Sequence, residues 1–418
     1  KIAALCPQAH FMFEPRRWYL APHLPEVTGF TNIDTKGMSG VERAANITLA
    51  GKPITMRSQK EARNSGLYFA EHIITPGTAG THLCLTIDQH LHFLVQQELA
   101  KTVAATKAVR ACALVMDPTN GHVITLTQAP SYNPNKPAHA PAEDRKNHLI
   151  GTCHEMGSVI TLFSALAALA EGITTPDELI NCEGKSAYID GFKVENEEKI
   201  GTVPFWQVFT QSSNVGIAKV CKRLGTLLYD HYNRLGFGAP TGIELPGERS
   251  GFVNPPERWS ASSPLLLSYG YEVMTTLLHV AKGVCLIANA GFAVVPTLHT
   301  NKRPVRGLQL YGQEPINQMR DMMQRAAQHY GITLPGYTVM SKAGSAHTLK
   351  NGRYSTTDRL HSCTGIIEKD GYKRVIVVFL QHPAKNMHTA HQATTTLFSR
   401  VATITALHEQ ACPPPRNA

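Results

Sequence analysis

Residues 155–172 read EMGSVITLFSALAALAEG. From Ser158 to Glu171 this segment is apolar on nearly every side, and Gly172 ends it. A helix that is apolar on every face belongs inside its domain, because no side of it meets water favourably. The stretch therefore predicts a buried helix with Ser158 at its N-terminus, where developing negative charge is favoured.

The composition is that of an ordinary globular protein. The chain has 418 residues, of which 43% are hydrophobic and 17% charged, and this length favours two or three domains. Forty Lys and Arg against 31 Asp and Glu give a net charge of +9. The surplus is spread along the chain without a block of like charges, which argues against nucleic-acid binding. Attraction to an anionic polymer or to membrane headgroups fits the charge equally well.

The start of the chain and its cysteines bear on location. The sequence begins at Lys1 and contains no run of 18 apolar residues, so no membrane span and no signal peptide are predicted within it. An anchor upstream of Lys1 stays open. The nine cysteines form no C-x-x-C pair, which predicts neither a zinc site nor a disulfide framework. So many free thiols count against an oxidising compartment.

Apolar periodicity predicts two regions. Residues 1–79 are short apolar runs broken by Gly and Pro, which favours a β-rich module with little helix. In residues 80–418, Asp88 is a predicted N-cap for a helix from Gln89 to about Lys107. Further helices are expected at Pro204–Leu224, Pro264–Ala290 and Ala390–His408, and strands at Ala111–Met116, His122–Gln128, Tyr337–Ala346, Ser362–Glu368 and Arg374–Gln381. This order predicts an α+β domain whose closing helix packs on a sheet made from both ends of the segment.

Several short motifs follow one another along the chain: Gly29–Gly37 with Gly40-Val-Glu42, Leu85–Asp88, Val115–Gly121, Pro130–Asn135, Gly247–Gly251, Arg258-Trp-Ser260 and Ser268-Tyr-Gly270. In this order they resemble class B penicillin-binding proteins, and the resemblance runs from about Tyr19 to about Leu407. The last three motifs are similar to the division-specific, septal branch of that family. The resemblance implies a penicillin-binding transpeptidase fold, in which helices and a mainly helical subdomain flank an antiparallel sheet, with an N-terminal pedestal at residues 1–79 and the transpeptidase-like domain at 80–418.

The resemblance also implies a reaction. Such proteins join peptidoglycan stem peptides through an acyl-serine intermediate, using the elements S-x-x-K, S-x-N and K-T-G. They bind β-lactams, work with a septal glycosyltransferase and other division proteins at the periplasmic face of the inner membrane, and need no metal or organic cofactor. By resemblance Ser158 is the nucleophile, Ser212 relays protons and Asn214 holds the substrate amide.

The first element is degenerate. Three residues after Ser158, on the same helix face, stands Thr161 where the family has the lysine that acts as general base. A threonine hydroxyl is far too weak a base for this role. Because losing a positioned base typically costs about 10²–10⁴ in rate, the sequence predicts a strongly impaired site.

The third element is partly degenerate. Lys342-Ala-Gly344 replaces K-T-G, so Ala343 lacks the hydroxyl that would help bind the substrate carboxylate. Gly344 is expected to let the substrate backbone approach the strand. Ser345 is expected to supply one hydroxyl and the second N–H of an oxyanion hole.

Two smaller departures lie near the expected site. Met156 stands where the family usually has proline, and Glu272 where it usually has glycine. His154, His347 and His361 are candidates for a replacement base, although a lone histidine is more often structural.

Three functions remain open. The chain could be a slow septal transpeptidase that uses Lys342 and Ser212 as its proton relay. It could be a non-catalytic paralogue that binds peptidoglycan or division partners. It could also be a penicillin-recognising hydrolase or β-lactamase, which the N-terminal module and the missing deacylation apparatus disfavour. Thr161 and Ala343 favour an impaired or inactive protein.

Overall fold

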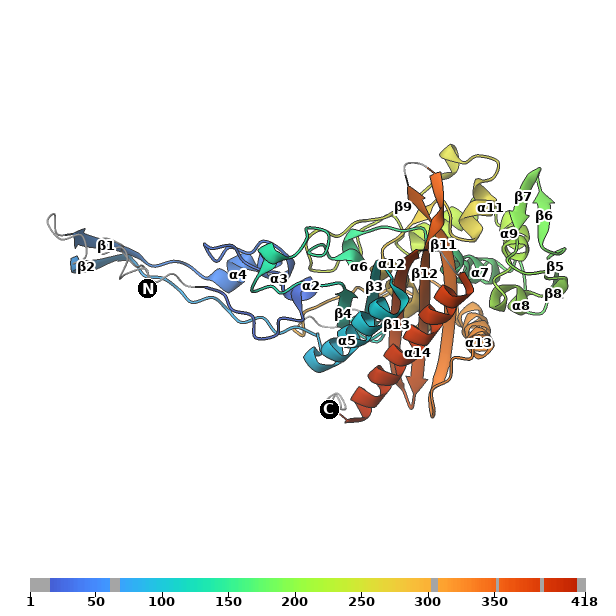
Figure 1. Cartoon of the computed structure of the whole chain (residues 1–418). Helices are drawn as coiled ribbons and strands as arrows, with labels where there is room; N and C mark the ends of the chain where they lie inside the picture. The colour runs from blue at the N-terminus through green and yellow to red at the C-terminus, as the bar shows by residue number, and fades with distance from the viewer. Residues whose placement is uncertain (1–15, 61–67, 302–306, 351–352, 384–386, 412–418) are drawn as a thin grey trace.

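A computed structural model describes residues 16–60, 68–301, 307–350, 353–383 and 387–411 (Figure 1). The chain forms an elongated molecule with a thin N-terminal arm at one end and a broad helix-rich body at the other. Cys6, Cys412 and the proline-rich tail lie outside the described residues. The other seven cysteines are unpaired thiols.

A five-stranded antiparallel sheet forms the centre of the body. Its order is β11-β12-β13-β3-β4, so strands from the two ends of the domain meet where β13 pairs with β3. The strands are β3 Arg110–Met116, β4 Val123–Ala129, β11 Thr338–Lys350, β12 Arg353–Lys369 and β13 Tyr372–Pro383. The five predicted strands are confirmed, as is a sheet built from both ends.

Two long helices cover one face of the sheet. Helix α5, Gln89–Thr106, and helix α14, Met387–Ala411, lie side by side (Figure 1). The predicted cap of α5 is confirmed, because the Leu91 amide donates to Asp88 Oδ1 at 2.9 Å. Helix α12, Leu277–Ala288, packs on β13, β12 and β3 within a second apolar core.

The remaining body is mainly helical. Its centre is α7, Thr161–Ala170, whose residues 161–169 are all buried, as its sequence predicts. The other helices are α6 His148–Gly151, α8 Phe205–Thr210, α9 Asn214–Lys222, α10 Leu227–Arg234, α11 Ser263–Ser268 and α13 Gln313–His329. Three small two-stranded sheets pair β5 Leu179–Asn181 with β8 Thr202–Pro204, β6 Ser186–Ile189 with β7 Phe192–Glu195, and β9 Phe252–Val253 with β10 Val273–Met274. The 3-10 turns are η1 Pro137–His139, η2 Gly157–Val159 and η3 Pro256–Arg258.

Two predicted helices are wrong in their continuity. The stretch 204–224 is broken into α8 and α9 by a turn in which Ser212 has a φ of 55°. The stretch 264–290 is broken into α11, β10 and α12. In each case polar turn residues interrupt an apolar pattern that continues on both sides.

The N-terminal region is an extended arm. Strands β1 Thr55–Lys60 and β2 Tyr68–Thr75 pair at its far end (Figure 1). Three short helices, α2 Pro25–Thr28, α3 Gly40–Ala44 and α4 Asn46–Ala50, lie nearer the body and add helix to the predicted β-structure.

Polar contacts join this region to the body. The Tyr19 amide donates to Asn135 Oδ1 and Asn135 Nδ2 donates to the Tyr19 carbonyl, both at 2.9 Å. The Asn147 amide group donates to the Glu26 carbonyl at 3.0 Å. The side chains of Asn135 and Asn147 in the body thereby satisfy backbone groups of the N-terminal region.

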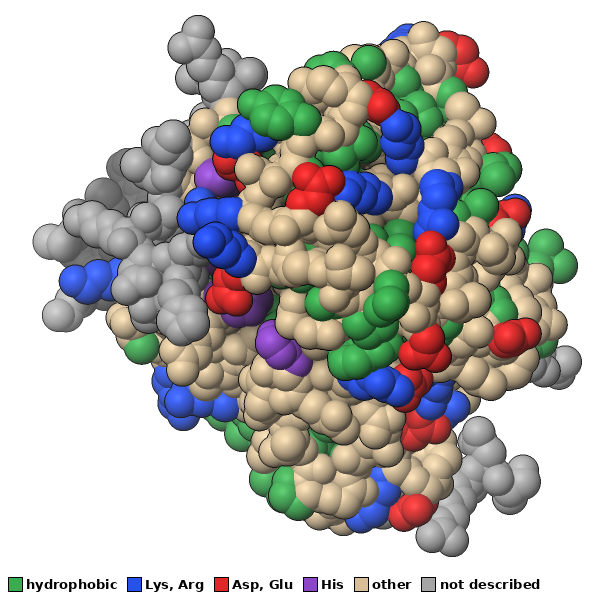
Figure 2. Space-filling view, turned by 90° about the vertical axis from the view of Figure 1, so that its right-hand side faces the viewer, with side chains coloured by type: hydrophobic (Ala, Val, Ile, Leu, Met, Phe, Trp, Pro, Cys, Tyr) green, Lys and Arg blue, Asp and Glu red, His purple; other side chains and the backbone are tan. Residues whose placement is uncertain are grey.

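The surface carries mixed charge. Figure 2 shows the helix-rich end, where basic and acidic side chains are interspersed and apolar side chains are scattered among them. No helix of the described ranges is both long and apolar enough to cross a bilayer.

Candidate active site

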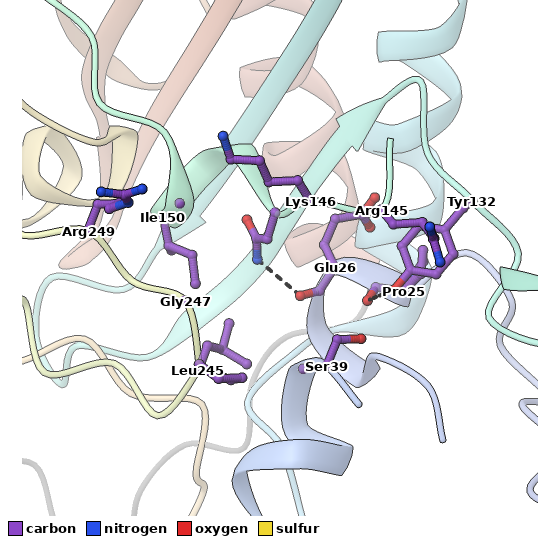
Figure 3. Close-up of a pocket in the computed structure, with 14 residues that line it drawn as sticks. Pro25, Glu26, Ser39, Tyr132, Arg145, Lys146, Ile150, Leu245, Gly247 and Arg249 are labelled. Carbon is purple, nitrogen blue, oxygen red and sulfur yellow. Dashed lines mark hydrogen bonds between the residues drawn. The ribbon is translucent and has the colours of Figure 1, made fainter. Parts of the chain in front are cut away.

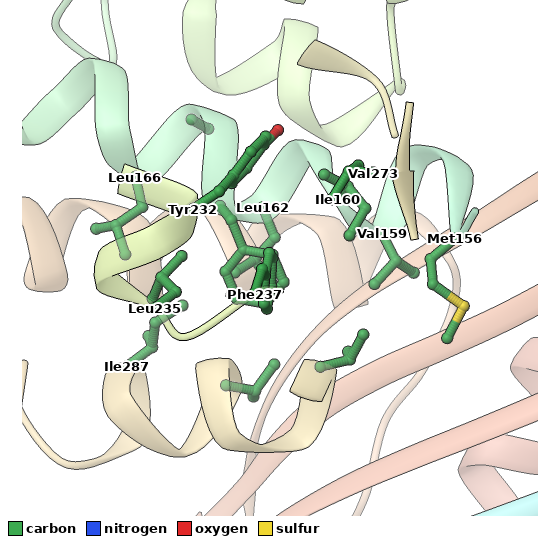
Figure 4. Close-up of a cluster of buried hydrophobic side chains, with 14 of the residues drawn as sticks. Met156, Val159, Ile160, Leu162, Leu166, Tyr232, Leu235, Phe237, Val273 and Ile287 are labelled. Atoms are coloured by element: carbon green, nitrogen blue, oxygen red, sulfur yellow. The ribbon is translucent and has the colours of Figure 1, made fainter. Parts of the chain in front are cut away.

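Ser158 lies in the 3-10 turn η2, immediately before α7. Apolar side chains on both sides of it, such as Met156, Val159 and Leu162, are buried in the same apolar cluster as Phe237 (Figure 4). The serine itself is half-buried, and its hydroxyl makes no hydrogen bond to any residue that the structure describes. Packing therefore fixes the serine backbone while leaving its hydroxyl available.

Two glycines bring β11 against this turn. A Cβ on Gly344 would lie 2.5 Å from the Val159 nitrogen and 3.1 Å from the Ser158 nitrogen. Gly157 has a φ of 54°, and its added Cβ would lie 2.1 Å from the Ser345 carbonyl oxygen. No side chain fits in either place, so glycine at both positions allows the strand to lie directly beside the serine.

Thr161 occupies the position of the missing base. It is 2% exposed, and its Oγ1 donates a hydrogen bond to the Ser158 carbonyl at 2.7 Å. The Thr161 hydroxyl proton is therefore used in a hydrogen bond to the helix backbone.

Lys342 is fully buried at the start of the degenerate K-A-G element. Its Nζ donates to Ser212 Oγ at 2.5 Å, to Tyr330 OH at 3.1 Å and to the Ala343 carbonyl at 2.9 Å. The rings of Phe209 and Tyr330 lie 5.4 and 5.8 Å from the ammonium. Within the described ranges no carboxylate pairs with it, so neutral oxygens and ring faces stabilise this cation.

The S-x-N element is positioned by the start of α9. Ser213 Oγ accepts from the Gly216 amide at 3.0 Å, which caps the helix, and donates to Asn196 Oδ1 at 3.0 Å. Asn214 Nδ2 donates to the Glu195 carbonyl at 2.9 Å. This capping places Ser212 in the turn from which it reaches Lys342. Asn196 has no motif of its own, and sequence reasoning missed it.

Ala343 and Ser345, on either side of Gly344 in β11, pair with residues of β12. Ala343 is 1% exposed and pairs with Cys363 across the sheet. Ser345 pairs with His361, and Ser345 Oγ lies 2.8 Å from His361 Nδ1. Ser345 thus has a hydrogen-bonding imidazole next to it on the neighbouring strand.

The two other candidate histidines are engaged elsewhere. His154 stacks on Phe379 with ring centroids 4.9 Å apart, and burial lowers its pKa to about 4. His347 Nδ1 lies 3.0 Å from the Ser355 carbonyl. None of the three histidines hydrogen-bonds the Ser158 hydroxyl within the described part of the chain.

An acidic pair lies beside the serine turn and was not predicted. The Glu272 amide and the Tyr354 hydroxyl both donate to Glu155 Oε1, at 2.8 and 3.1 Å. Glu155 is 8% exposed, and burial raises its pKa. Glu272 has a φ of 59°, in the left-handed region that favours glycine, which gives a physical reason for the glycine usual there.

The arrangement suits acyl transfer. It combines a serine at a helix start, a strand packed against it and a buried cation bonded to a second serine. Over the described ranges, no group of three His, Cys, Asp or Glu side chains could hold a metal ion.

Comparisons with known proteins show a family and a fold that this chain shares. The family described as the penicillin binding protein transpeptidase domain matches residues 111–402. The peptidoglycan D,D-transpeptidase FtsI of Escherichia coli K12 is 30% identical over 355 residues, which are 83% of this chain and 60% of that protein. FtsI of Buchnera aphidicola is 24% identical over 402 residues, 94% of this chain and 70% of that protein. The chain thus spans about 60% of the length of the Escherichia coli relative.

Solved structures share the fold. Penicillin binding protein 3 from Mycobacterium tuberculosis, complexed with aztreonam, has a TM-score of 0.80 at 24% identity and covers 96% of this chain and 91% of its own. The transpeptidase domain of Burkholderia pseudomallei penicillin-binding protein 3 has a TM-score of 0.70 at 23% identity and covers 80% of this chain and 98% of its own.

Proposed function

Because the chain belongs to the penicillin-binding protein transpeptidase family, we propose that it binds peptidoglycan stem peptides and β-lactams at Ser158, as a septal D,D-transpeptidase with impaired catalysis. The single observation that carries this proposal is the hydrogen bond from Lys342 to Ser212, on the strand that Gly344 holds against Ser158. A catalytic cation and a proton-relaying hydroxyl are thereby kept together although the usual base is absent.

In this proposal, Ser158 Oγ attacks the carbonyl carbon of a D-Ala-D-Ala peptide bond. The C–N bond breaks, terminal D-alanine leaves with a proton, and an amine or water then releases the acyl group. Ser212 shuttles the proton under the influence of Lys342. The Ser158 and Ser345 amides stabilise the oxyanion, Asn214 holds the substrate amide, and Gly344 and Ser345 bind the substrate backbone and carboxylate.

The impairment follows from two side chains. Thr161 has no basic atom, and its hydroxyl already donates to the Ser158 carbonyl. Ala343 offers no hydroxyl to a substrate carboxylate. We expect acylation about 10²–10⁴-fold slower than with a positioned base.

A second candidate function is a non-catalytic paralogue that keeps the binding cleft. It is favoured by Thr161, which places no basic atom beside the serine and whose hydroxyl already donates to the Ser158 carbonyl.

The arm offers a surface for division partners such as a septal glycosyltransferase. Its hairpin region exposes apolar side chains, including Ile54, Met56, Ile73 and Ile74, each about half exposed. Exposed apolar groups on a thin hairpin have no core of their own to join, so a partner would cover them. An extracytoplasmic location at the inner membrane, where peptidoglycan is assembled, accompanies this proposal.

Labelling with a fluorescent penicillin tests the function directly. We expect slow, stoichiometric labelling of the wild type that Ser158→Ala abolishes, with intact-mass analysis placing the adduct on Ser158. Labelling that persists in Ser158→Ala would contradict the assigned nucleophile. If the wild type stays unlabelled yet still binds a stem pentapeptide in a titration, the protein is a non-catalytic paralogue and the proposal of an enzyme is wrong.

A further inference from the structure

A cavity of about 370 Å³ lies between the N-terminal region and the body, away from Ser158. One wall comes from Glu26 on α2 and the other from residues of 145–151 and 245–249, so both regions must be in place to form it (Figure 3). We call it the junction pocket. Its volume is within the range typical of sites for small organic molecules.

Three cationic side chains line the junction pocket: Arg145, Lys146 and Arg249. None of them forms an ion pair with any residue that the structure describes, and Arg145 Nε is buried without a hydrogen-bond partner. An uncompensated group of cations around a concave surface attracts anions.

Nearby acidic residues do not neutralise these cations. Glu143 and Asp144 instead lie 3.9 and 3.5 Å from Arg110. Glu248 accepts a hydrogen bond from the Thr241 amide at 2.8 Å. The positive charge in the pocket is therefore free for a ligand.

Glu26 supplies the second, independent observation. It lines the pocket and is 4% exposed, and its Oε1 accepts from Ser131 while its Oε2 has no partner among the described residues. A buried carboxyl oxygen without a partner is costly, and a ligand that hydrogen-bonds it relieves that cost. Burial raises the pKa of Glu26 to about 8. At neutral pH this carboxyl is therefore mostly protonated and can donate to an oxyanion.

The apolar lining narrows the ligand class. Ile150, Leu245, Pro25 and Pro246 provide carbon surface beside the polar groups. Inorganic phosphate has no carbon atoms to pack against this apolar surface, whereas a dicarboxylate has a short hydrocarbon chain that can do so. We propose that the junction pocket binds a small organic dicarboxylate, held by Arg145 and Lys146 and by a hydrogen bond from Glu26.

Isothermal titration of the full chain with glutarate tests the proposal, with inorganic phosphate as the comparison anion. We expect saturable 1:1 binding of glutarate, weakened at least tenfold by Arg145→Gln or Lys146→Gln. Arg43→Gln, which alters an exposed arginine outside the pocket, is the matched control and should leave affinity unchanged. Thermal melts confirm that each variant is folded.

Two further experiments distinguish this pocket from other sites. Lys342→Met removes the buried cation of the active site and should not change glutarate affinity, because binding is elsewhere. Affinity of the wild type should fall several-fold between pH 7 and pH 9 as Glu26 ionises, and Glu26→Gln should remove that fall. The raised pKa of Glu26 comes mainly from its burial, and the titratable groups that feel its charge are Cys112 and Tyr132, whose own pKa values are raised to about 12.

Four results overturn the proposal: no saturable glutarate binding, affinity unchanged in Arg145→Gln and Lys146→Gln, loss of binding in Lys342→Met, or phosphate binding as tightly as glutarate. The last would reduce the pocket to a general anion site.

Discussion

Thr161 Oγ1 donates a hydrogen bond to the carbonyl of Ser158, the residue that it would have to activate, at 2.7 Å. At the position where the family has its general base, this hydroxyl thus serves the backbone in the first turn of a buried helix. Lys342 remains the only lysine that the assigned site retains, and it hydrogen-bonds Ser212. In the proposed mechanism, activation of Ser158 therefore comes from Lys342 and Ser212 rather than from position 161.

Replacing Thr161 by lysine should restore the base. We expect Thr161→Lys to accelerate penicillin acylation about 10²–10⁴-fold, because a positioned amine can then take the Ser158 proton. Stopped-flow or gel-based labelling with fluorescent penicillin measures the rate. Thr161→Met, of similar length without the amine, is the control and should show no gain. An equal gain in Thr161→Met would assign the effect to packing.

Removing the Lys342 ammonium should separate stability from function. Lys342 is 0% exposed and no described carboxylate pairs with it, so its desolvation is costly. We expect Lys342→Met to keep or raise the free energy of unfolding, by up to roughly 1–3 kcal/mol, while abolishing penicillin labelling. Denaturant unfolding and labelling on the same samples measure both. A Lys342→Met protein that labels at the wild-type rate would exclude Lys342 from the relay.

Releasing the strained backbone at Glu272 should stabilise the protein. Glycine adopts a φ of 59° without strain, so Glu272→Gly should gain about 1 kcal/mol, less what the Asn254 hydrogen bond to Glu272 contributes. The control is Glu257→Gly, at an exposed position in η3 without positive φ, which should lose stability. Thermal melting measures both. Equal destabilisation by the two changes would mean that Glu272 stores no strain.

Glu26 should make stability fall as pH rises. Its pKa is raised from 4.5 to about 8 in the folded protein, so the folded state holds a proton that the unfolded state releases between these values. Stability from this group is complete below about pH 4.5 and is lost as pH rises through about 8, by on the order of 2–4 kcal/mol. Glu26→Gln should flatten this dependence in urea unfolding from pH 5 to pH 9. Glu257→Gln, a change on the surface, is the control, and its stability should depend on pH as that of the wild type does. If the stabilities of the wild type and of Glu26→Gln change with pH in parallel, Glu26 is not buried in its protonated form.

Long periodic segments were predictable from the sequence. The helix after Ser158, the cap at Asp88 and all five sheet strands follow from periodicity and capping, because these signals are local. Helix α13 was missed because its buried residues, mainly Met and Ala, are diluted by many polar ones. The breaks at Ser212 and after Ser268 were missed because turn chemistry interrupted an apolar pattern that otherwise continued.

The candidate site was predictable in its parts but not in its contacts. Motif order brought Ser158, Ser212 and Lys342 into consideration, and the structure adds which of them touch. The Glu155–Glu272 contact joins residues 117 positions apart through a backbone amide, and a backbone donor leaves no trace in residue identity. Tyr330 beside Lys342 was missed for a similar reason, since a single tyrosine carries no spacing signal.

The reciprocal bonds between Tyr19 and Asn135 have a consequence for dissecting the molecule. Trimming the chain to residues 80–418 would remove Tyr19 and Glu26 together, so Asn135, 5% exposed in the intact protein, would lose both of its hydrogen bonds to Tyr19. The predicted boundary at residue 79 is therefore a poor place to cut. A transpeptidase fragment made there should melt earlier and aggregate more readily than the whole chain, so its loss of activity would say nothing about Ser158.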